Sequence, residues 1–141
     1  MINNSASKTW QPIDFTIYFS FLKWLVAAAL LLEIIFRWRT GVSAGGFLFD
    51  KMEIIVWIFR FFVFAFLGWR VFKNFGHSPA VAALAGALAG FIIGLAVSLF
   101  RFFEGVKIWK FFNLITETTL VVLFGVLVSI AVVYILSLKM R

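Results

Sequence analysis

Cysteine is absent from this sequence of 141 residues, histidine occurs once, and acidic residues number six. The lack of cysteine excludes disulfide bonds, thiolate nucleophiles and thiolate metal sites. The single histidine, His77, has no second imidazole or neighbouring carboxylate beside it, so we assign it no site. No metalloprotease, serine-hydrolase or phosphate-loop motif is present. The sequence therefore predicts a protein that is not an enzyme and that holds no metal and no cofactor.

Apolar residues take up most of the chain. Hydrophobic residues make up 64% and charged residues 13%, proportions far from those of soluble globular proteins. The aromatic residues include 20 phenylalanines, which are favourable at the bilayer centre, and 6 tryptophans, which collect at its two faces. The net charge of +7 is dispersed along the chain, so we expect no nucleic-acid partner. These features predict an all-α integral membrane protein whose first partner is the lipid bilayer.

The chain contains four apolar runs that are each long enough to cross about 30 Å of hydrocarbon as a helix. They cover residues 15–38, 54–72, 79–103 and 114–138. Residues 1–13 form a polar N-terminal tail, and residues 14–141 form one transmembrane domain. The first run is too long for the apolar part of a signal peptide, so we expect it to be retained. The prediction is a multi-pass protein of the cell membrane, with its four transmembrane helices in a compact bundle.

Two connections in this bundle have recognisable local signals. Gly76 suits the C-cap of one helix, and Ser78 with Pro79 suits the cap and first turn of the next. The second and third spans are therefore predicted to form an antiparallel hairpin. Between the third and fourth spans, residues 106–112 place Lys107 and Lys110 beside aromatic and aliphatic residues. That composition predicts a short helix in the headgroup region of the bilayer.

The third span repeats a small residue at every fourth position, and we call this set the small-residue stripe. Its members are Ala82, Gly86, Gly90, Gly94 and Ser98. Small residues on one helical face allow a second backbone to approach closely, as in a glycine zipper. The fourth span offers a matching set, Thr118, Gly125 and Ser129. We predict packing within one chain as the main use of the stripe, with homo-oligomerisation as the alternative.

Two ionisable residues inside predicted spans are candidates for a functional site, because charges in lipid are costly. Glu33 lies near the end of the first span and Arg60 near the start of the second, so both approach the same face of the bilayer. An ion pair between them is geometrically allowed. Two alternatives stay open: Glu33 pairing locally with Arg37, and Arg60 reaching back to the interface or to Glu53.

The orientation of the bundle rests on the charges near the ends of its spans. Four spans place both termini on one side, and Lys and Arg are then distributed equally between the two sides, so the positive-inside rule does not decide. Acidic residues fall mainly on the loop side, which favours cytoplasmic termini. An equal distribution is also what a dual-topology protein would show.

Three functions are compatible with these features. The first is a non-catalytic membrane protein that acts through helix–helix contacts, as a homo-oligomer or as a small accessory subunit of a membrane complex. The second is a small transporter or channel that uses Glu33 and Arg60. The third is a membrane-perturbing protein of the holin type, indicated by small size and basic ends.

Overall fold

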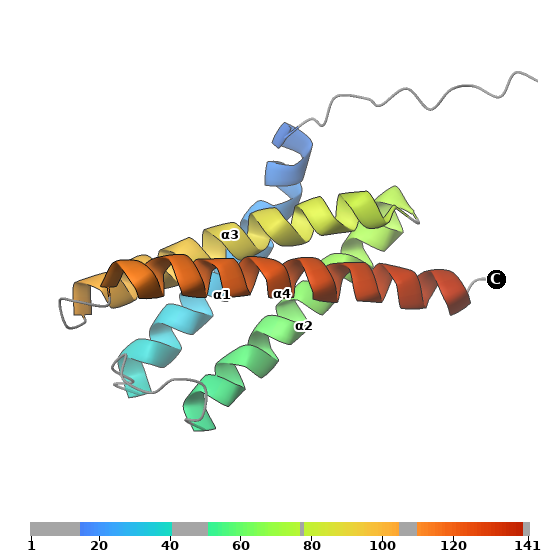
Figure 1. Ribbon diagram of the computed structural model, residues 1–141. Helices are drawn as coiled ribbons and strands as arrows, with labels where there is room; N and C mark the ends of the chain where they lie inside the picture. The colour runs from blue at the N-terminus through green and yellow to red at the C-terminus, as the bar shows by residue number, and fades with distance from the viewer. Residues whose placement is uncertain (1–14, 41–50, 77, 105–109, 140–141) are drawn as a thin grey trace, which may run out of the picture.

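The fold is built from four helices (Figure 1). The computed structural model describes residues 15–40, 51–76, 78–104 and 110–139. The helices within these residues are α1 (Phe15–Thr40), α2 (Lys51–Phe75), α3 (Pro79–Glu104) and α4 (Lys110–Lys139), and no strand occurs among them. The predicted all-α class is confirmed for this part of the chain. The N-terminal tail, residues 1–13, lies outside the described residues.

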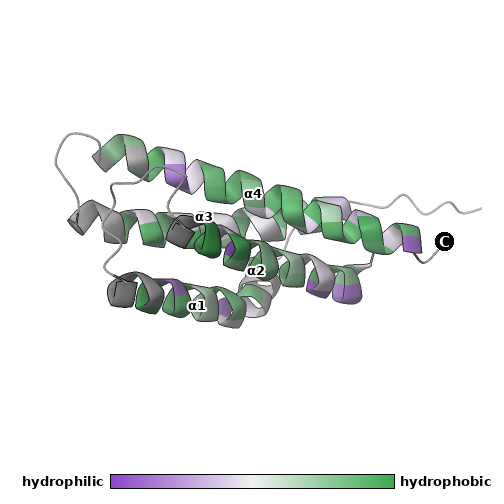
Figure 2. Cartoon of the chain, turned by 90° about the horizontal axis from the view of Figure 1, so that it is seen from below, coloured by the Kyte–Doolittle hydropathy of each residue, from purple (hydrophilic) through white to green (hydrophobic). Residues whose placement is uncertain are grey.

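Three of the helices are long and apolar enough to cross a membrane. The stretches concerned are Ile54–Phe75 in α2, Pro79–Leu99 in α3 and Leu114–Lys139 in α4. Green, hydrophobic ribbon accordingly covers most of these helices in Figure 2. The chain is therefore a membrane protein. A further span over α1 stays a prediction.

Helices α3 and α4 form the central pair of the bundle. They run side by side and antiparallel over nearly their whole length, while α1 and α2 cross them obliquely (Figure 1). Helix α2 packs against both members of this pair, whereas α1 packs against α2 and α3 only. Among the described residues, no Cα atom of α1 comes within 8 Å of one in α4. The bundle is thus a tight helix pair with two more loosely attached helices.

The turn between α2 and α3 confirms the predicted hairpin. Gly76 adopts a left-handed backbone conformation with φ of 69°, and its N–H donates to the Phe72 carbonyl at 2.9 Å. This is how a C-cap glycine closes a helix, because a left-handed residue satisfies one of the last free carbonyls. On the other side of the turn, the Ser78 hydroxyl accepts from the Val81 N–H at 3.5 Å. His77 lies between them and outside the described residues.

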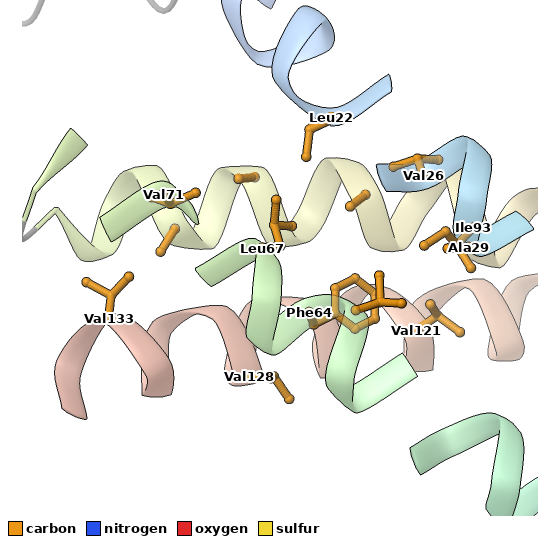
Figure 3. Packing of buried hydrophobic residues seen from close by; sticks show 14 of the residues in the cluster. Leu22, Val26, Ala29, Phe64, Leu67, Val71, Ile93, Val121, Val128 and Val133 are labelled. Carbon is orange, nitrogen blue, oxygen red and sulfur yellow. The ribbon is translucent and has the colours of Figure 1, made fainter. Parts of the chain in front are cut away.

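The apolar core collects residues from all four helices around α3 (Figure 3). Leu22 and Val26 of α1 lie on one side of α3, and Val121 of α4 lies on the other. Phe64 and Leu67 of α2 fill the space between the helices and are fully buried. Such aromatic and aliphatic contacts hold helices together in lipid by close packing, since burial from water gives little driving force there.

The separate interfacial helix that the sequence predicts over residues 106–112 is not confirmed. Residues 105–109 lie outside the described residues, and α4 begins at Lys110. Residues Lys110, Phe111 and Phe112 therefore belong to α4, and the predicted break before Leu114 is wrong. The physical reason is that Asn113 is tolerated inside a helix, so that its capping preference does not by itself start a new one.

Candidate functional site

A buried arginine lies at the centre of the most unusual site in the described structure. Arg60 of α2 is only 2% exposed, although its guanidinium carries a full charge inside the apolar stretch Ile54–Phe75. At about 1.5 Å per residue, it lies about 9 Å from the start of that stretch. An arginine at this depth needs a partner, because an unpaired charge in hydrocarbon costs several kcal/mol. The alternative in which Arg60 reaches back to the interface does not agree with its burial.

Glu33 of α1 is the first partner of this arginine. The Nη2 of Arg60 donates to Glu33 Oε1 at 2.5 Å, and its Nε donates to Oε2 at 3.3 Å. The contact is bidentate, which is the arrangement that a planar guanidinium offers to a carboxylate. Glu33 is itself 2% exposed. The structure thus brings together the two charged residues that the sequence singles out, across 27 positions of the chain.

Glu117 of α4 is a second carboxylate at the same guanidinium. Its Oε1 lies 3.5 Å from Arg60 Nη2, and its side chain is 13% exposed. Arg60 therefore links α1 to α4, two helices whose backbones do not approach each other closely in the described structure. Sequence reasoning did not single out Glu117. Its position inside the fourth apolar stretch, Leu114–Lys139, was the signal available, since an acid at that depth is unusual.

An aromatic ring completes the surroundings of the guanidinium. Arg60 Cζ lies 4.9 Å from the centre of the Trp57 ring, one helical turn earlier on α2. Trp57 in turn packs edge-on against Phe124 of α4, with ring centres 5.2 Å apart. A cation over an aromatic face gains about 2 kcal/mol when the pair is shielded from water. We call Glu33, Trp57, Arg60 and Glu117 the Arg60 cluster.

The Arg60 cluster places two carboxylates at one guanidinium. An arginine guanidinium stays protonated and is neither a nucleophile nor a general base. In the part of the chain that the structure describes, no group of three or more His, Cys, Asp or Glu side chains could hold a metal ion. The cluster can therefore fasten helices together, or it can offer a fixed charge to something that moves through the bundle.

The small-residue stripe lies against α4, where helix axes come unusually close. A Cβ placed on Gly90 would lie 2.8 Å from the Val121 carbonyl oxygen, and one on Gly94 would lie 2.9 Å from Thr118 Cα. Real Cβ atoms do not come this near to a backbone, so only glycine fits. At the ends of the stripe, Ala82 and Ser98 are also buried. The Ser98 hydroxyl accepts a hydrogen bond from Thr118 Oγ1 at 3.4 Å.

The matching residues of α4 face both α3 and α2. A Cβ on Gly125 would lie 2.6 Å from the Gly86 carbonyl oxygen. Ser129 is fully buried, and its hydroxyl donates to the Phe64 carbonyl of α2 at 3.4 Å. Gly68 of α2 makes the same kind of close approach, since its Cβ would lie 2.9 Å from the Ser129 carbonyl oxygen. Sequence reasoning missed Gly68, which stands alone in an aromatic stretch rather than in a repeat.

Most exposed side chains that the structure describes on the helices are apolar, and Lys23 is a charged exception in the middle of an element. Lys23 of α1 is exposed, and its Nζ lies 5.8 Å from the ring centre of its neighbour Trp24, which is itself 74% exposed. Ala27 and Ala28, one turn further on, are also exposed. This face of α1 thus combines a cation with small residues.

Comparison of the chain with protein-family models, with curated proteins and with solved structures finds no match in any of the three.

Proposed function

We propose that this chain is a non-catalytic membrane protein that crosses the bilayer with four helices and acts through helix–helix contacts, as a small accessory subunit of a membrane complex. Both termini lie on the cytoplasmic side in this proposal. Its interior supports such a role: the small-residue stripe is taken up by α4, and both carboxylates of the Arg60 cluster lie against the same guanidinium. In this proposal, contacts with a partner protein are therefore made by the outer surface of the bundle.

The outer face of α1 is the observation that carries this proposal. Lys23 lies about 12 Å along the helix from Phe15, at about 1.5 Å per residue, so it sits well inside the membrane if α1 spans it. A lysine there costs about 2.5 to 3.5 kcal/mol before its side chain bends toward the interface. A carboxylate on a neighbouring helix would remove this cost. Exposed Ala27 and Ala28 would let that helix approach closely.

A partner of different sequence fits this face better than a second copy. In a two-fold dimer the same patch meets itself, so that each copy would bring one Lys23 and no acidic residue to the shared interface. Like charges in a low-dielectric medium repel strongly. The small-residue stripe also gives no surface to a homo-oligomer, because α4 covers it. The partner in this proposal is therefore a membrane helix with an acidic residue.

Site-specific cross-linking in the native membrane tests the proposal. A photoreactive amino acid at Ala27 should give a covalent adduct with one other membrane protein, and Lys23→Gln should reduce its yield several-fold. The matched control carries the same photoreactive residue at Leu123, on the exposed face of α4. Adducts with lipid alone at Ala27, or equal protein adducts from both positions, would contradict the proposal.

A second candidate is a small transporter or channel, and the Arg60 cluster favours it. A cation shared by two carboxylates on different helices is the kind of intramembrane site that moves ions or protons. Reconstituted liposomes should then show solute or proton flux that Glu33→Gln and Arg60→Gln abolish. Lys73→Gln, at an exposed position on the same helix as Arg60, is the control that should keep the flux. Absence of flux with the unmodified protein removes this candidate.

A further inference from the structure

A hollow of about 180 Å³ lies between α1 and α2, next to the Arg60 cluster. Leu32 and Glu33 line it from α1, and Ile55, Val56 and Phe59 line it from α2. The two helices meet each other over a short length only, which leaves this space between them. Neither of the two functions proposed above involves this hollow.

The hollow has a buried floor and an exposed mouth. Glu33 and Val56 are 2% and 6% exposed, so they form the floor. Leu32 and Ile55 are 54% and 49% exposed, so they form the mouth. Ile55 is the second residue of the apolar stretch Ile54–Phe75, so the mouth opens at the edge of the hydrocarbon region, where the acyl chains of phospholipids begin.

The lining favours a hydrocarbon occupant over water or a cation. Four of the five lining residues are apolar, and both oxygens of the fifth, Glu33, accept from Arg60. A water molecule needs two to four polar partners, and an apolar cavity of about 150 Å³ stays dry and binds small hydrocarbons instead. A drug-sized molecule needs a pocket of about 300 Å³ or more. A segment of a flexible chain fits both the volume and the chemistry.

We propose that this hollow is a binding site for the acyl chain of a bilayer phospholipid. The chain enters between Leu32 and Ile55 and lies on Val56 and Phe59. In that position it covers the side of the Glu33–Arg60 ion pair that faces the hollow and keeps water away from it. The ion pair gains strength from this, because charges attract more strongly in a low dielectric. The site depends on the membrane location of α2 and not on any partner protein.

Photolabelling with a lipid tests the site. The full-length protein is reconstituted into liposomes that contain a phosphatidylcholine with a diazirine in its acyl chain, irradiated, and mapped by mass spectrometry. Adducts should concentrate on Leu32, Ile55, Val56 and Phe59, several-fold above those on Leu123 and Leu127, which are exposed apolar residues of α4. Leu32→Trp, which fills the mouth, should reduce the adducts on α2 several-fold. Leu31→Trp, at a neighbouring exposed position outside the hollow, should leave them unchanged.

A second pair of variants keeps the test decisive if Leu32→Trp does not fold. Val56→Phe fills the floor from α2, and Ile58→Phe adds a similar side chain at an exposed position of the same helix. Native mass spectrometry after delipidation should find one phospholipid retained by the unmodified protein and by Ile58→Phe, and none by Val56→Phe. Even labelling of the hollow and of α4, or equal lipid retention by both variants, overturns the proposal.

Discussion

Gly86 of α3 and Gly125 of α4 lie backbone against backbone, with so little space that a Cβ on Gly125 would stand 2.6 Å from the Gly86 carbonyl oxygen. The two helices therefore meet through main-chain atoms, not through side chains. Such contacts allow dispersion attraction and weak Cα–H···O interactions over a long seam. The α3–α4 pair is the part of the fold on which the other helices rest.

Substitution in this seam should destabilise the protein. Gly90→Leu places a side chain where even a Cβ would lie 2.8 Å from the Val121 carbonyl oxygen, so the helices must separate. We expect a loss of about 3 kcal/mol or more, at the upper end of what overpacking costs. Unfolding in a denaturing detergent series measures the change. Ala80→Leu, at an exposed position of the same helix, should stay within about 0.5 kcal/mol of the unmodified protein.

Removal of the buried guanidinium should be among the most damaging single changes. Arg60→Leu leaves the Glu33 carboxylate buried without its bidentate partner, for which we expect a loss of about 3 to 5 kcal/mol. The same unfolding series measures it. Replacing the three charged members together, by Glu33→Leu, Arg60→Met and Glu117→Leu, should restore most of the stability, since apolar groups need no partner. A triple variant less stable than Arg60→Leu would contradict a role of the charges as mutual partners.

The turn at Gly76 has space for a larger side chain, but its left-handed backbone conformation is unfavourable for residues other than glycine. No atom lies within 4 Å of a Cβ placed there, but the φ of 69° is unfavourable for L residues. Gly76→Ala should therefore cost about 1 to 2 kcal/mol through strain alone. Gly76→Asn should cost less, because asparagine enters the left-handed region more readily. Equal losses for the two variants would contradict strain as the cause.

The stability of the protein should fall when the side chain at position 129 becomes larger, and should change only slightly when the Ser129 hydroxyl is removed. The hydrogen bond to the Phe64 carbonyl is long at 3.4 Å, and hydrogen bonds between membrane helices average about 0.6 kcal/mol. Ser129→Ala should thus lose about 0.6 kcal/mol or less. Ser129→Val adds a branch where Gly68 and Gly86 lie close, and should lose about 1 to 3 kcal/mol. Thermal unfolding in mild detergent compares the two variants. A larger loss of stability for Ser129→Ala than for Ser129→Val would contradict the prediction.

The number of spans can be read from the sides on which introduced cysteines lie, because the natural chain has none. Single cysteines at Ser7, Ser43 and Met140 are labelled with a membrane-impermeant maleimide in intact cells and after lysis. Four spans predict that Ser7→Cys and Met140→Cys are labelled only after lysis, and Ser43→Cys in both cases. Three spans predict that Ser7→Cys behaves like Ser43→Cys. Partial labelling at every position would indicate dual topology.

The helices and the turn at Gly76 follow from local signals in the sequence: apolar length, Gly at a helix end, and Ser-Pro at the next start. The start of α4 does not, because Asn113 allows either a cap or a helix interior, and neighbouring residues decide. In the Arg60 cluster, Glu33 and Arg60 are visible as charges in apolar runs, but their pairing depends on how α1 crosses α2. The third member, Glu117, depends on which face α4 turns to α2, and no local pattern of the chain specifies that rotation.

If α1 spans the membrane, the link that Arg60 makes between α1 and α4 predicts an order in which the helices insert. Glu33 is synthesised before Arg60, and Glu117 follows only after α3 is complete. A first helix that enters the membrane before α2 carries Glu33 without Arg60. Insertion of α1 together with α2 avoids that state, and the arrival of α4 then adds the second carboxylate. Truncation after α1 should therefore yield a segment that inserts poorly, whereas the α1–α2 hairpin already holds its own counter-charge.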